Sequence, residues 1–199
     1  MGLETAKVLG EFGPVLIGGR NPKRLENALN ELKEAGIEAY GKPCDISNKD
    51  SLKEFVEYAV SIAPIGNVVN AAGVDYGAVP RDMLLKINML GTHYVLEAFL
   101  PYLDNSNVVN YSSVTGYFYQ PKKEEMELWM NPDADDFIEK VSEIIPVPTD
   151  PRMVALGPDY TAYADLIKHL LTPGHEYLTG CDIIMDGGRT ALGMYPQFK

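Results

Sequence analysis

The chain has 199 residues, and its 17 Lys and Arg against 28 Asp and Glu give a formal net charge of −11. This length suits a single domain, and the acidic balance argues against nucleic acid or an anionic membrane as a partner. The chain has two cysteines and no Cys/His cluster with metal-site spacing, so we expect no metal site and a reducing compartment. No apolar run approaches the roughly 18 residues of a membrane span, so we expect a cytoplasmic protein.

Helices and strands are predicted to alternate from the first residues onward. Apolar residues at helical spacing indicate an amphipathic helix over residues 2–12, and the apolar run at 15–19 is typical of a strand buried on both faces. Asn21 and Pro22 are residue types that start helices, so a helix follows them, and Gly36 ends it after about residue 35. The order continues with strands at 38–44, 67–72 and 107–113 and helices at 47–62 and 80–103.

This alternation predicts the fold class. Strands that alternate with helices through short connections form a parallel sheet with helices on both faces. We therefore expect an α/β fold, a Rossmann-like doubly wound parallel sheet, in a single domain over residues 1–199.

The alternation breaks at residues 117–158. This stretch holds a charged loop, the only tryptophan, Trp129, and a short amphipathic helix over 133–145 that prolines follow. A connection of this length in a compact domain is usually a lid, a binding loop or a disordered segment, so we expect a lid-like insertion. Beyond it, a helix at 159–171 and a strand at 181–185 resume the pattern.

Residues that follow the predicted strands are the candidates for a binding site, because ligands of doubly wound sheets bind beyond the carboxyl ends of the strands. These residues are mostly polar or glycine-rich, as a dinucleotide site requires. They are Arg20, Asp45, Ile46, Asn70, Ala71, Ala72, Gly73, Ser112, Ser113, Asp186, Gly187 and Gly188.

Several of these segments together resemble the short-chain dehydrogenase/reductase family. Asn70-Ala71-Ala72-Gly73 after a strand, Asn88 in the long helix, the strand at 107–113 and the segment 178–188 occur in the family's order. The likeness covers most of the chain outside 117–158. It implies an NAD(P)-dependent oxidoreductase that transfers a hydride between a nicotinamide cofactor and a secondary alcohol or carbonyl. Aromatic residues in 117–158 favour a hydrophobic, steroid-like small molecule as substrate, with a packed surface flap as the alternative.

The resemblance also implies roles in cofactor binding. Gly2 matches the last glycine of the family's glycine-rich turn, where the pyrophosphate approaches a helix N-terminus. Arg20 would pair with a 2′-phosphate, which favours NADP over NAD, although a solvated surface arginine is the alternative. Asp45 with Ile46 would bracket the adenine, and Asp45 could equally cap the next helix. The turn from Asn70 through Ala71 and Ala72 to Gly73 would pass the nicotinamide ribose.

For the chemistry, the resemblance assigns Ser113 to the substrate oxygen, Asn88 to a relay water and Tyr163 to acid–base catalysis. The family's Tyr-x-x-x-Lys is incomplete at Tyr163, because the nearest lysine, Lys168, follows five residues later and lies off the same helix face. The alternative function is therefore a truncated, catalytically inactive dinucleotide-binding protein.

Two elements of the family have no counterpart in the sequence: its first strand and the block after the catalytic tyrosine. The absent block also contains a strand, and both absent strands are interior in the family's sheet. We therefore expect a sheet that is incomplete relative to the family. Either the chain is shorter than the gene product, or it is a truncated relative with a rearranged sheet. The family commonly forms dimers or tetramers through the long helix at 80–103, so a homo-oligomer is expected if that interface is intact.

Overall fold

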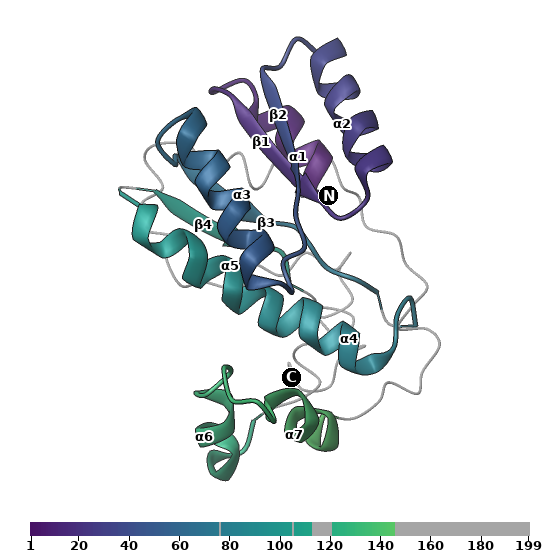
Figure 1. Ribbon diagram of the computed structural model, residues 1–199, viewed down its shortest axis with the longest axis vertical. Coiled ribbons are helices and arrows are strands. Elements are labelled where there is room, and N and C mark those ends of the chain that lie inside the picture. The colour runs from purple at the N-terminus through teal and green to yellow at the C-terminus, as the bar shows by residue number, and fades with distance from the viewer. Residues whose placement is uncertain (76, 105, 113–120, 146–199) are drawn as a thin grey trace, which may run out of the picture.

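The computed structural model of the chain describes residues 1–75, 77–104, 106–112 and 121–145 (Figure 1). Ser113, Tyr163, the helix predicted at 159–171 and the strand predicted at 181–185 lie outside the described residues.

The first part of the chain follows the predicted order. Its elements are α1 (Gly2–Leu9), β1 (Val15–Gly19), α2 (Pro22–Glu34), β2 (Ala39–Pro43) and α3 (Lys49–Ile62). Local caps set the helix boundaries: the side chain of Asn21 accepts a hydrogen bond from the backbone N–H of Arg24, and that of Asn48 accepts one from Ser51. Gly36 has φ of 77°, the left-handed conformation that commonly follows the end of a helix.

The predicted long helix forms, but it is not uniform. It consists of α4 (Arg81–Leu85), the π-helical turn η1 (Lys86–Leu90), α5 (Gly91–Phe99) and the 3-10 turn η2 (Leu100–Tyr102). Along the chain this helix follows β3 (Asn67–Asn70) and precedes β4 (Asn107–Asn110). Both strands end earlier than predicted. The chain turns away from the strand after Asn70, where the side chain of Asn70 accepts a hydrogen bond from the backbone N–H of Ala72.

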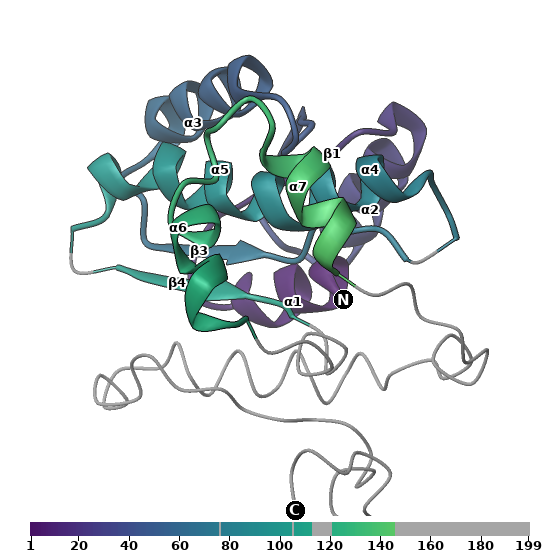
Figure 2. The ribbon, with the colours of Figure 1, turned by 90° about the horizontal axis from the view of Figure 1, so that it is seen from below.

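Part of the predicted insertion is described, as η4 (Lys123–Glu125), α6 (Met126–Trp129) and α7 (Phe137–Ile144). The helix predicted from residue 133 begins only at Phe137, since the preceding acidic stretch forms turns. Helix α7 packs against α4, and α6 packs against α7 (Figures 1 and 2). Phe137 and Val141 of α7 are buried against Leu85 of α4 and Leu90 of η1, so a second, small apolar core joins this segment to the long helix.

The described strands are all parallel, and they form two pairs. β1 pairs with β2, with Val15 opposite Ala39, and β3 pairs with β4, with Asn67 opposite Asn107. Within the described residues these are separate two-stranded sheets, so β1 and β3 are not joined edge to edge. The α/β Rossmann-like class is confirmed, and the strands among these residues do not form one continuous sheet.

The main apolar core lies where α3 and α5 pack on each other and on the strands. Leu52 and Val56 of α3 are buried with Val95 and Phe99 of α5. Their burial beside Val68 of β3 joins the second strand pair to the helices on its face. No helix in the described part of the chain is long and apolar enough to span a membrane.

Candidate functional site

Asn70, the last residue of β3, is the centre of a buried polar network. The residue is 5% exposed. The Nδ2 group donates to Oγ1 of Thr92 at 3.3 Å and to Oδ1 of Asn110 at 3.2 Å, while Oδ1 accepts from the backbone of Ala72 at 3.3 Å. Asn70 therefore joins the ends of β3 and β4 to α5 and also shapes the turn that follows it.

Asn88 holds the same turn from the helix side. Its Oδ1 accepts from the backbone N–H of Val74 and its Nδ2 donates to the carbonyl of Val74, each at 2.9 Å. This two-bond clamp fixes the chain directly after Gly73, whose α-carbon faces Asn88: a Cβ at Gly73 would lie 3.4 Å from Oδ1. The side-chain amide of Asn88 is thus used to position the turn from residue 71 to 74.

The clamp comes from the π-helical turn η1, in which Asn88 lies. Hydrogen bonding in such a turn skips one residue further than in an α-helix, and π-turns within α-helices frequently occur at functional sites. The hydroxyl of Thr92 donates to the carbonyl of Asn88 at 3.0 Å and so supports the turn from its C-terminal side. Thr92 therefore links Asn88 to Asn70 through one hydroxyl group.

Asp45 follows β2 and is held as an ionised carboxylate. Its Oδ1 accepts from the hydroxyl of Ser47 at 2.7 Å and from the Ser47 backbone at 3.0 Å. Burial raises the pKa of Asp45, but the hydrogen bonds from Ser47 and the positive charges of Arg20 and Lys86 outweigh it, so the net pKa lies below its usual value. The N-cap of α3 is Asn48, so Asp45 shapes the turn before the helix and does not cap it.

Ile46 packs against the helix that carries the clamp. A Cβ at Gly91 would lie 2.7 Å from Cδ1 of Ile46, a distance that real side chains do not tolerate. Glycine at the start of α5 therefore lets the residues after β2 approach the helix closely.

Gly2 and Arg20 complete this end of the molecule. Gly2 begins α1, and a Cβ there would lie 3.3 Å from Cβ of Ala71 in the turn after β3. Arg20 is exposed directly after β1, and its charge reaches Asp45. The N-terminus of α1 therefore lies beside the turn that follows β3, and the dipole and backbone N–H groups of a helix N-terminus favour an anion.

Residues 1–124 match the family model for short chain dehydrogenases. The chain belongs to the short-chain dehydrogenase family.

Relatives within this family match part of the chain. An uncharacterised oxidoreductase of Staphylococcus aureus strain MW2 is 28% identical in an alignment of 129 residues, and the match covers 59% of this chain and 55% of the relative. The chain thus spans about half the length of the curated relatives it matches.

Solved structures of a ketoreductase and a dehydrogenase share the fold. A variant of actinorhodin polyketide ketoreductase with NADPH is 23% identical with a TM-score of 0.65, covering 94% of this chain and 92% of its own. NAD⁺-bound xylitol dehydrogenase is 22% identical with a TM-score of 0.65 and 90% of each chain covered. At these identities the likeness shows the fold alone.

Among the residues that the short-chain dehydrogenase resemblance predicts for a cofactor site, the structure places Gly2 against Ala71, and Arg20 close enough to Asp45 to lower its pKa. The catalytic assignments of Ser113 and Tyr163 fall outside the described residues and stay predictions. Sequence reasoning missed Gly91 and Thr92, which directly follow the π-turn. An isolated glycine inside a helical pattern was the available signal, because such a glycine usually has a packing reason.

Proposed function

We propose that the chain is an NAD(P)-dependent oxidoreductase that transfers a hydride between a nicotinamide cofactor and a secondary alcohol or carbonyl of a small molecule. The observation that carries the proposal is the clamp of Asn88 on Val74. It holds the small-residue turn after Asn70 against the N-terminus of α1. Family membership supports the same activity.

The described residues fit a dinucleotide. Backbone N–H groups at the start of α1 and the helix dipole suit a pyrophosphate, and the side chains of Ala71 and Ala72 leave room for the cofactor to approach the backbone. The ionised Asp45 carboxylate suits the exocyclic amine of adenine, with Ile46 beside it. When bound, the cofactor supplies or accepts the hydride.

Arg20 supports a preference for NADP. Its guanidinium is exposed at the end of β1 and is suited to bidentate hydrogen bonds with a 2′-phosphate. We expect the Arg20→Ala variant to bind NADP⁺ at least tenfold more weakly and NAD⁺ unchanged in calorimetric titrations. Arg24→Ala, which removes an exposed arginine at the start of α2, is the matched control. An unchanged ratio of the two affinities would remove Arg20 from the proposal.

In the proposed reaction Ser113 would hydrogen-bond the substrate oxygen and Tyr163 would transfer the proton to or from it. Asn88 would act by positioning, since its side chain holds the turn at Val74. Oxidation of NADPH with a panel of hydrophobic ketones, including steroids, tests the activity. The proposal expects turnover that Tyr163→Phe and Ser113→Ala both abolish.

One observation favours a second function, a dinucleotide-binding protein without catalysis. The position four residues after Tyr163 holds Ile167 and not lysine. Tyr119 and Tyr195 do have lysine four residues later, but Pro121 and Pro196 interrupt the required helical face. Cofactor binding without turnover would establish this second function.

A further inference from the structure

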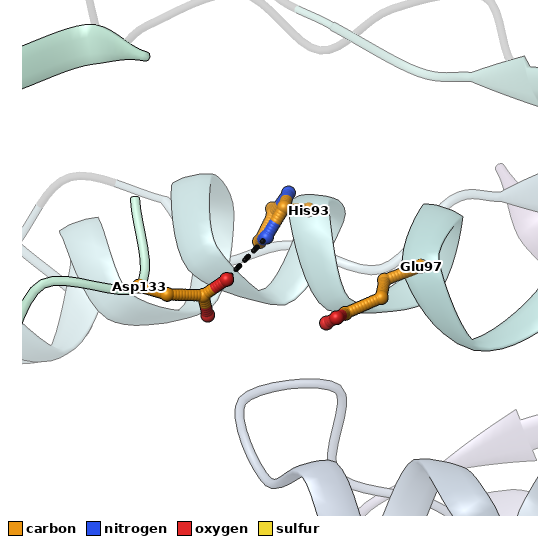
Figure 3. A group of neighbouring side chains, drawn as sticks. All are labelled: His93, Glu97 and Asp133. Carbon is orange, nitrogen blue, oxygen red and sulfur yellow. Dashed lines mark hydrogen bonds and ion pairs between the residues drawn. The ribbon is translucent and has the colours of Figure 1, made fainter. Parts of the chain in front are cut away.

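Three side chains of types that can bind a metal ion lie together where α5 meets the turn that precedes α7 (Figure 3). His93 and Glu97 are one helical turn apart on α5, so they project from the same face. Asp133, from the turn between α6 and α7, lies opposite them, with its Oδ2 at 3.4 Å from Nε2 of His93. One ligand atom from each of the three lies within 4.8 Å of the others.

This position already attracts a cation. The ammonium of Lys49, at the start of α3, lies 3.0 Å from Oε2 of Glu97 and 2.9 Å from Oδ1 of Asp133. It also lies 4.5 Å from the ring centroid of Tyr94. Both carboxylates therefore face a positively charged group.

We propose that His93, Glu97 and Asp133 bind a divalent transition-metal ion such as Zn²⁺, which replaces the ammonium of Lys49. One imidazole nitrogen and two carboxylate oxygens form a ligand set that Zn²⁺ accepts, with water in the remaining position. Mg²⁺ and Ca²⁺ prefer oxygen ligands alone, so the histidine favours the transition metal.

The exchange is physically simple because the groups concerned are half-exposed. The side chains of Lys49, Glu97 and Asp133 are 50%, 54% and 50% exposed, so the ammonium can turn into water while the carboxylates close on the ion. An exposed ion pair contributes little to stability, so the outgoing lysine is a weak competitor. A bound ion would tie the α6–α7 segment to α5 in addition to the apolar contacts of α7.

Calorimetric titration of the full chain with Zn²⁺ alone tests the site. We expect His93→Gln and Asp133→Asn each to weaken one binding event at least tenfold. Lys49→Met, which removes the competing cation, should tighten the same event several-fold. Glu54→Gln is the matched control, because it removes an exposed carboxylate that pairs with Lys42 at 3.6 Å.

Circular dichroism confirms that each variant is folded, and Co²⁺ in place of Zn²⁺ gives an absorption spectrum that reports nitrogen and oxygen ligands. Zn²⁺ binding that His93→Gln leaves unchanged would overturn the proposal, since the ion then binds elsewhere. A Lys49→Met variant that binds no more tightly, or equal losses in Glu54→Gln, would overturn it as well.

Discussion

The contribution of the clamp of Asn88 on Val74 to the free energy of unfolding can be measured by removing the Asn88 side chain. Asn88→Ala deletes two hydrogen bonds of 2.9 Å, and a net contribution of about 1 kcal/mol for each gives a loss of about 2 kcal/mol. Alanine is a better helix former than asparagine by about 0.7 kcal/mol, so the observed fall in the free energy of unfolding should be about 1.3 kcal/mol.

The control for this prediction is Asn30→Ala, which replaces an exposed asparagine on α2 and retains the gain in helix propensity alone. The free energies of unfolding of the two variants, measured with urea, should therefore differ by about 2 kcal/mol. Hydrogen exchange gives a second, local reading: the amide of Val74 should lose protection in Asn88→Ala and keep it in Asn30→Ala. If the two variants unfold with the same free energy and Val74 stays protected, the clamp does not hold the turn.

Further expectations concern packing and ionisation. Gly91→Ala forces the side chain of Ile46 to move and should cost about 1–3 kcal/mol in urea unfolding. Val141→Ala empties part of the fully buried contact of α7 and should cost about 2 kcal/mol, with a near-neutral result arguing that α7 is not docked. Burial raises the pKa of the Cys44 thiol to about 11, so iodoacetamide at pH 8 should label Cys44 only in the unfolded chain, as peptide mapping would show. Because folding lowers the pKa of Asp45, its ionised carboxylate stabilises the fold at pH values above the usual pKa of 3.8. This contribution is lost as the pH falls through the lower pKa of the folded state, and Asp45→Asn should lack that loss in acid titrations of stability.

Local signals made the first helices predictable. The starts of α2 and α3 depend on hydrogen bonds from residues three positions apart in the chain, and Asn21 and Asn48 supply them whatever the rest of the fold does. Even so, Asn48 lay unrecognised as the cap of α3, because the neighbouring Ser47 and Asp45 are equally good candidates by type. The structure shows that these two bond to each other.

Long-range contacts were beyond local reasoning. Asp133 bonds to Lys49, which is 84 residues away in the chain, and nothing near either residue indicates the other. The π-turn at Asn88 is similar: its sequence is an ordinary helical pattern, and the turn is seen only with its tertiary partner Val74 in place. Ser113 and Tyr163 still rest on resemblance alone.

Helices, and not strand pairing, connect the two strand pairs among the described residues. Because β1–β2 and β3–β4 share no ladder among these residues, the two pairs are connected through α1 and through the contact of α3 with α5. Thr5 of α1 is 2% exposed, and its hydroxyl lies 2.8 Å from that of Tyr111 beyond β4, while the same helix contacts β1. The N-terminus of α1 is also the proposed pyrophosphate site, with Gly2 against Ala71. A ligand that orders this helix would therefore act on both strand pairs at once, so cofactor binding and stability of the fold should be coupled.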